Sequence, residues 1–190
     1  MTMGSVGQQW TFRGITRATL PVLLGLTIVA VGSGLVLGSF EDKLVEHPSL
    51  LVLVPVTIGT AGNLGSLLAS RLSTAFHLGT LSFSPADDHL AGNAVATLLL
   101  ALTLFPLIGA GAWGLSVLTT GADLSLRTVV LIAFTSGAGL AVFAVLVTVV
   151  TTYAAYRLGL DPDDVVIPVV TNTCDVLGVV MLFVAVFVFT

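Results

Sequence analysis

Residues 128–156 read TVVLIAFTSGAGLAVFAVLVTVVTTYAAY and contain no charged side chain. A helix needs about 20 consecutive apolar residues to cross the hydrocarbon core of a bilayer. Over the whole chain 56% of the residues are hydrophobic and 8% are charged, with a mean hydropathy of +1.10, whereas soluble domains carry about 25% charged residues. A water-soluble fold of this sequence would have no polar face for solvent, so the sequence predicts an integral membrane protein.

We predict an all-α protein with one transmembrane domain, residues 1–190. Short polar segments separate five expected transmembrane helices, at residues 18–40, 49–70, 91–115, 127–152 and 165–190. Residues 1–17 are expected to form a short cytoplasmic segment. Its aromatic and basic residues (Trp10, Phe12, Arg13 and Arg17) favour a helix at the membrane interface. A start without regular structure, anchored by the two arginines, is the alternative.

The basic residues predict the orientation, because cytoplasmic loops carry an excess of Lys and Arg. With the N-terminus inside, four of the six basic residues are cytoplasmic: Arg13, Arg17, Arg71 and Arg157. Lys43 and Arg127 then lie outside. We therefore expect a multi-pass protein of the cell membrane with its N-terminus inside and its C-terminus outside.

Several function classes are disfavoured by the composition. The net charge of −4 provides no basic patch for nucleic acid. The single cysteine, Cys174, excludes a multi-cysteine metal site. An aspartyl intramembrane protease needs two buried aspartates, and a serine or metal hydrolase needs a histidine deep in a span. Since the three histidines are expected in loops (His47, His77 and His89), we predict that the chain is not an enzyme.

Asp175 is the one acidic residue deep in any predicted span. It lies about ten residues into the last span, near the bilayer midplane. A carboxylate at this depth costs at least about 2.5–3.5 kcal/mol, so it marks a functional site unless it is protonated or paired with a base. No Lys, Arg or His lies deep in another span to pair with it. Asp175 is therefore our principal candidate cation ligand.

The last span surrounds Asp175 with suitable groups. Helical spacing places Pro168, Thr171 and Gly178 on its face. Thr171 adds a hydroxyl, and Pro168 leaves a backbone carbonyl without its helical hydrogen bond. At the start of this span, Asp161 is a good N-cap and also a candidate ligand at the cytoplasmic mouth, and the two roles are compatible.

The second span carries a matching face, formed by Pro55, Gly59, Gly62, Asn63 and Ser66. Helix packing through small residues is the simplest explanation of the glycines. It does not account for Asn63, whose amide oxygen is a neutral ligand. We therefore predict that these residues line a hydrated pathway.

All the candidate ligands are oxygens, which suit Mg²⁺, Ca²⁺ or Mn²⁺ better than Zn²⁺ or Cu⁺. Mg²⁺ keeps much of its hydration shell and is often bound by one or two carboxylates through water. A two-fold dimer would bring two copies of Asp175 to a shared axis. The leading hypothesis is therefore a dimeric Mg²⁺ transporter in the lipid bilayer, with a homodimer or a paralogue as partner. The alternatives are a non-transporting assembly subunit and a transporter of another divalent cation such as Mn²⁺ or Ca²⁺.

Two segments resemble the MgtE magnesium transporters and the related eukaryotic solute-carrier magnesium transporters. Residues 55–79, PVTIGTAGNLGSLLASRLSTAFHLG, are similar to the family's second-helix signature, and residues 161–178, DPDDVVIPVVTNTCDVLG, are similar to its last helix. Five helices with this orientation also fit the family. Where bacterial members often carry a glutamine after the Gly-Asn core, this chain has Ser66 and Leu67.

This resemblance implies a dimeric, channel-like pathway lined by the second and fifth helices of both subunits, with Mg²⁺ as the transported ion. By motif position, Asp175 corresponds to the pore aspartate and Asp161 to the aspartate at the cytoplasmic mouth. Gly59, Gly62 and Asn63 correspond to the second-helix signature. Bacterial members also carry large cytoplasmic regulatory domains, which these 190 residues do not contain, so the resemblance does not extend to gating by them.

Overall fold

The computed structural model describes residues 11–84, 87–119, 121 and 124–190. The regular structure in these residues is helical, as the sequence predicts. The helices are α2 (Phe12–Gly38), α3 (Glu41–Glu46), α4 (Pro48–His77), α5 (Asp88–Thr119), α6 (Leu126–Leu158) and α7 (Pro162–Phe189). All except α3 are long and apolar enough to cross a membrane. The prediction of five membrane-spanning helices is therefore confirmed by length and composition.

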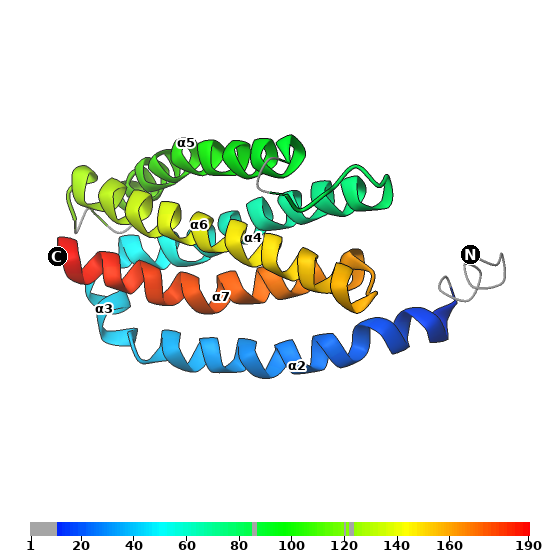
Figure 1. The fold of residues 1–190 in the computed structure, drawn as a ribbon. Coiled ribbons are helices and arrows are strands. Elements are labelled where there is room, and N and C mark those ends of the chain that lie inside the picture. Colours follow the sequence, from blue (N-terminus) through cyan, green and yellow to red (C-terminus); the bar gives the residue numbers. More distant parts are fainter. Residues whose placement is uncertain (1–10, 85–86, 120, 122–123) are drawn as a thin grey trace.

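The long helices form a bundle in which consecutive spans run in opposite directions (Figure 1). Helix α6 packs against α4, α5 and α7, and α4 also packs against α5 and α7. Helix α2 packs against α7 at the edge of the bundle opposite α5 (Figure 1). Most large apolar side chains of α2 remain exposed in the single chain, including Leu24, Ile28 and Leu35. Helix α7 is thus held between α2 on one side and α4 and α6 on the other.

The first span starts earlier than predicted. Helix α2 begins at Phe12 instead of residue 18, because the Thr11 hydroxyl caps it by accepting a hydrogen bond of 3.2 Å from the Gly14 N–H. Arg13 and Arg17 therefore lie in the first turns of α2, and their place at the membrane interface stays a prediction. Trp10, which also belongs to that prediction, lies outside the described residues.

The other helices also extend beyond their apolar cores. Helix α4 continues through His77, seven residues past its predicted end, so His77 is helical and not part of a loop. Helix α6 ends at Leu158 because Gly159 adopts the left-handed conformation (φ +67°) that suits a helix C-cap. The short helix α3 lies in a segment where no helix was predicted. Apolar length marks the bilayer crossing, whereas caps set where each helix ends.

Small residues allow close packing between α5 and α6. Ala133 and Gly137 of α6 are buried. Gly137 lies directly against the Phe105 ring, and a methyl group on Gly109 of α5 would lie 2.9 Å from the Ala133 Cβ. In α2, by contrast, a methyl group on Gly34 or Gly38 would meet nothing within 4 Å. Small residues thus allow close contacts between α5 and α6, while the two α2 glycines face open space in the single chain.

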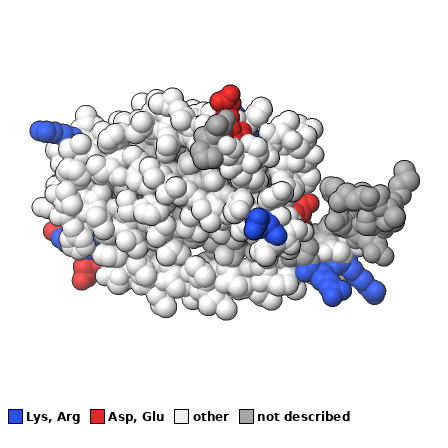
Figure 2. Space-filling view, in the orientation of Figure 1, with Lys and Arg blue, Asp and Glu red and all other residues white. Residues whose placement is uncertain are grey.

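Apart from Asp175 in the middle of α7, the charged side chains of the described residues lie near the ends of the helices, and the middle of the face drawn in Figure 2 is free of them. The α2 start and the α6 end lie at one end of the bundle, with the α4 end (Figure 1). This end carries the four arginines that the sequence assigns to the cytoplasm. The arrangement fits the predicted membrane crossing, and the orientation stays a prediction.

Asp87, directly before α5, is buried, with 7% of its surface exposed. Its carboxylate caps α5 by accepting hydrogen bonds from the His89 and Leu90 N–H groups at 2.9 and 3.1 Å. It also accepts from the N–H and the hydroxyl of Ser82 at 2.6 and 2.9 Å. These hydrogen bonds, that from the Ser82 N–H foremost, lower the pKa of Asp87 to about 2.

Candidate cation pathway

Asp175 lies in the middle of α7, as the fourteenth of its 28 residues. Its side chain is half-buried. Within the part of the chain that the structure describes, no hydrogen-bond donor or basic group contacts its carboxylate. An ion pair or a buried hydrogen bond would explain a carboxylate in the middle of this helix, but neither has a partner among the residues that the structure describes.

Helices α4 and α7 are antiparallel, and two glycines show where they touch. A methyl group on Gly62 of α4 would lie 3.8 Å from the Thr171 Cγ2. A methyl group on Gly178 of α7 would lie 2.6 Å from the Ile58 Cγ1. Thr171 and Gly178 flank Asp175 by about one turn on each side and share its helical face. Asp175 therefore lies at the level of α4 between Ile58 and Gly62.

Gly59 of α4 lies at this level. It is exposed, and a methyl group on it would meet nothing within 4 Å. Pro55 and Asn63, one turn before and one turn after Gly59, are also exposed, and together the three form a stripe along α4. In the described part of the chain, the Asn63 amide has no hydrogen-bond partner. An unpartnered amide is costly against lipid, so this stripe is better suited to water, an ion or another protein surface.

The remaining predicted residues of α4 lie at the edge of this stripe. Gly62 is buried under Thr171. Ser66 is partly buried, and its hydroxyl donates a hydrogen bond of 2.8 Å to the Gly62 carbonyl. These two residues connect the stripe to the α4–α7 contact.

The polar residues of α7 before Asp175 bond to their own helix. The Thr171 hydroxyl lies 3.1 Å from the carbonyl oxygens of Ile167 and Pro168, and the Asn172 amide nitrogen donates to the Pro168 carbonyl at 3.1 Å. The Thr171 hydroxyl proton and one N–H of the Asn172 amide are used in this way, and the Thr171 Oγ1 lone pairs and the Asn172 amide oxygen remain available as acceptors. Half-buried Pro168 has no N–H, which leaves the Asp164 carbonyl without its helical donor.

Ser33 is a contributor that the sequence prediction missed. Its hydroxyl donates a hydrogen bond of 2.9 Å to the backbone carbonyl of Asp175, across from α2 to α7. Ser33 is 7% exposed, in a helix whose other side chains are mostly exposed. The only sequence signal is its position between two glycines, Gly32 and Gly34, which is a general sign of helix packing.

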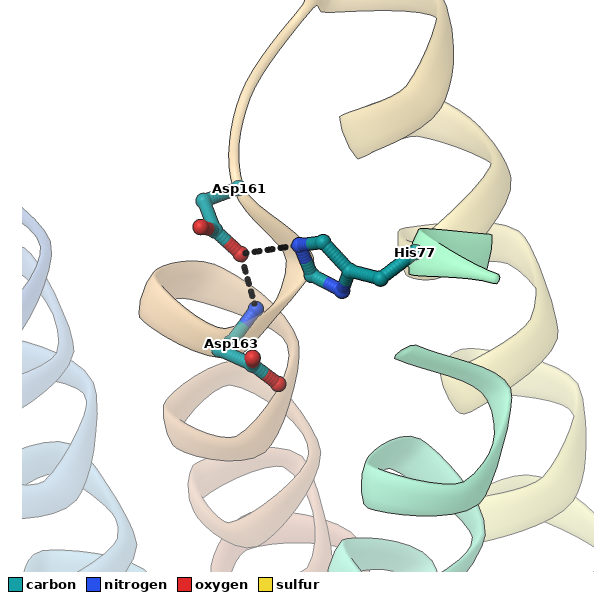
Figure 3. Close-up of side chains that lie close together, drawn as sticks. All are labelled: His77, Asp161 and Asp163. Carbon is teal, nitrogen blue, oxygen red and sulfur yellow. Dashed lines mark hydrogen bonds and ion pairs between the residues drawn. The ribbon is translucent and has the colours of Figure 1, made fainter. Parts of the chain in front are cut away.

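Asp161 lies apart from this group. Fourteen residues of helix separate it from Asp175, which corresponds to about 21 Å along the α7 axis. Its carboxylate caps α7 by accepting a hydrogen bond of 3.0 Å from the Asp163 N–H, and it lies 3.7 Å from the His77 Nε2 (Figure 3). The predicted capping role of Asp161 is confirmed. The structure thus separates the ten predicted residues into a mid-helix group and one residue at the end of α7.

Gly178 belongs to the helix contact in the single chain. It is buried, with Ile58 on one side and Leu140 of α6 on the other. Its lack of a side chain lets α7 approach both neighbours. Its place on the pathway surface stays a prediction.

The sequence of this chain is similar to those of known transporters over most of its length. The model of the MgtE family, described as divalent cation transporters, matches residues 54–185. Solute carrier family 41 member 2 of Homo sapiens is 30% identical over 85% of this chain and 30% of its own length. The magnesium transporter MgtE of Thermus thermophilus is 32% identical over 88% of this chain and 35% of its own. The chain thus spans about a third of each relative. No solved structure matches the chain.

Proposed function

This chain belongs to the MgtE family of divalent cation transporters, and we propose on that basis that it moves Mg²⁺ across the membrane past the Asp175 carboxylate. Two relatives, one bacterial and one human, support the family assignment. The bacterial relative is itself named a magnesium transporter. The matched region contains both segments that carry the candidate ligands.

The single observation that carries this proposal is the unpartnered carboxylate halfway along α7. An uncompensated charge in the bilayer lowers stability, so a fold that keeps it must gain something in function. A hydrated Mg²⁺ supplies what the single chain does not, because its bound waters donate hydrogen bonds to a carboxylate. Asp175 would hold the ion through these waters, and the Thr171 hydroxyl oxygen would accept from the same hydration shell.

A second subunit completes the pathway in this proposal. The stripe of Pro55, Gly59 and Asn63 is exposed on the single chain, at and around the level of Asp175. A pathway along this stripe needs another wall to exclude lipid. A second copy related by a two-fold axis would provide that wall and a second Asp175. Two carboxylates facing one hydrated ion match the charge of Mg²⁺.

Oxygen ligands also suit Mn²⁺ and Ca²⁺, so the mode of binding decides which of these cations the site prefers. A site that binds through water favours Mg²⁺, which loses its hydration shell most reluctantly. Ca²⁺ prefers direct contact with six to eight oxygens, more than the residues around Asp175 offer.

The experiment is Mg²⁺ entry into proteoliposomes that contain the purified protein and an internal Mg²⁺ dye. We expect entry driven by an inside-negative potential and absent from protein-free vesicles. Mn²⁺ and Ca²⁺ are then added outside in turn, and we expect neither to reduce Mg²⁺ entry at equal concentration. A folded, reconstituted protein without any divalent cation entry would favour the alternative of a non-transporting assembly subunit.

A further inference from the structure

A histidine and two aspartates meet where the end of α4 approaches the start of α7 (Figure 3). His77 is the last residue of α4, Asp161 is the N-cap of α7, and Asp163 lies in the first turn of α7. One ligand atom from each residue can be chosen so that all three lie within 4.8 Å of one another. Figure 3 shows the imidazole ring directed toward the Asp161 carboxylate.

The hydrogen bonds of the His77 Nδ1 bear on whether Nε2 carries a proton or a lone pair. The His77 Nδ1 lies 2.9 Å from the Ser73 backbone carbonyl oxygen, which can only accept a hydrogen bond. Nδ1 donates to this oxygen when it carries the ring proton, and the Ser73 hydroxyl also lies 3.4 Å from Nδ1. In the neutral ring with its proton on Nδ1, the Nε2 lone pair faces the Asp161 oxygen at 3.7 Å. Two lone pairs that face each other repel unless a cation lies between them, either a proton, which gives an ion pair of imidazolium and carboxylate, or a metal ion. A histidine bound to a metal has this arrangement, with its other nitrogen donating to a carbonyl.

N-terminal capping explains only part of the cluster. The Asp161 carboxylate accepts the Asp163 N–H, as an N-cap does. Capping requires neither the His77 imidazole nor its orientation. The ligand set of one imidazole and two carboxylates also differs from the oxygen-only set around Asp175. Imidazole favours zinc and the neighbouring transition metals over Mg²⁺.

We propose that His77, Asp161 and Asp163 form a binding site for a transition-metal ion of the Zn²⁺ class, which ties the end of α4 to the start of α7. Tetrahedral zinc with bonds of about 2.0–2.2 Å places its ligands about 3.4 Å apart. The three side chains are exposed, so small rotamer changes bring their ligand atoms from within 4.8 Å to this spacing. Water takes the fourth position. The site requires neither transport nor a second subunit.

Zinc binding to the purified full chain in detergent tests the proposal directly. Isothermal titration at about pH 7.5, where an ordinary imidazole is neutral, should show one Zn²⁺ per chain. A large excess of Mg²⁺ should leave this binding in place. His77→Gln and Asp163→Asn should each weaken it by about tenfold or more, since even the loss of an outer-shell partner has an effect of that size.

Matched controls separate this site from adventitious binding at the surface. His89 and Asp88 are exposed residues of the α5 start and lie outside the cluster. His89→Gln and Asp88→Asn should retain the wild-type zinc affinity. An equal loss of affinity in the controls and in His77→Gln would overturn the proposal, as would displacement of zinc by Mg²⁺ or the absence of binding.

Hydrogen exchange tests the connection between the helices. The last turn of α4 and the first turn of α7 include unpaired backbone groups that fray. Zinc should slow amide exchange in both segments of the wild type and in neither segment of His77→Gln. Slower exchange in only one of the two helices would contradict a site that bridges them.

Discussion

The Ser33 hydroxyl donates a hydrogen bond to the backbone carbonyl of Asp175 at 2.9 Å. It joins α2, which is otherwise largely exposed, to the residue of α7 that carries the mid-helix carboxylate. The contact lies between two helices, so it helps to set how α7 presents Asp175. The position of α2 and the geometry of the candidate site are thus linked by a named contact.

Ser33→Ala should test this link. We expect a loss of about 0.6 kcal/mol in the free energy of unfolding, the average for a hydrogen bond between membrane helices. We also expect slower Mg²⁺ entry, because α7 loses a contact at Asp175. Thr27→Ala is the control, since the Thr27 hydroxyl bonds to the Leu23 carbonyl of its own helix. Equal behaviour of the two variants in unfolding and in flux would remove Ser33 from the site.

Gly178→Ala should destabilise the fold. The added methyl group would lie 2.6 Å from the Ile58 Cγ1 and 3.1 Å from the Leu140 Cδ2, so the Ile58 side chain or α7 itself must shift. Overpacking of this kind costs about 1–3 kcal/mol. Thermal unfolding in detergent measures the effect. A variant as stable as the wild type would show that Gly178 does not hold α7 against α4 and α6.

Gly59→Ala, unlike Gly178→Ala, should leave the stability of the fold intact and slow Mg²⁺ entry. The methyl group meets nothing within 4 Å in the single chain, and alanine favours a helix over glycine by about 0.8–1.0 kcal/mol. We therefore expect no loss of stability, but a lower rate of Mg²⁺ entry because the methyl group projects toward the proposed pathway. Gly34→Ala in α2 is the control, since its methyl group also meets open space. Wild-type flux in Gly59→Ala would place Gly59 against lipid.

Asp87 predicts a pH dependence of stability. Its pKa falls to about 2 in the folded chain, from about 3.9 in an unfolded one. A lowered pKa stabilises the fold above the unfolded value, and this contribution is lost as the pH falls from about 4 through about 2. We expect Asp87→Asn to melt below the wild type at neutral pH and to approach it in acid. Melting temperatures of both proteins across this range measure the difference, and a constant gap would contradict the assignment.

The orientation can be tested with single cysteines in a Cys174→Ala background. Ser39 lies after α2 and Thr80 lies after α4, and both are exposed. If the N-terminus is inside, an impermeant maleimide added to intact cells labels Ser39→Cys at once. Thr80→Cys then reacts only after permeabilisation. The reverse pattern would invert the topology.

The sequence predicted the properties that helical spacing determines, namely the position of a residue along its helix and the face that it shares with others. Asp175 lies in the middle of its helix, and Pro55, Gly59 and Asn63 share an exposed stripe, because a single helix fixes both properties. The ends of the helices were predicted less well. Apolar length shows where a helix crosses lipid, whereas α4 continues to His77 through polar residues that hydropathy does not mark.

Contacts between helices could not be predicted in this way. No spacing relates His77 to Asp161 or Ser33 to Asp175, because each pair depends on which helices are neighbours and on their register. The same limit applies to Gly178. Its helical face was identified from the sequence, but the burial of that face against Ile58 depends on where α4 lies.

The most direct test of the central claim compares Mg²⁺ entry into proteoliposomes for the wild type, Asp175→Asn and the control Asp88→Asn. The account predicts that Asp175→Asn folds normally and transports at least about tenfold more slowly, because a hydrogen bond to a charged group contributes about 1.5–3 kcal/mol. Asp88→Asn should transport like the wild type. Equal flux in all three proteins would contradict the account and place the ion pathway away from Asp175.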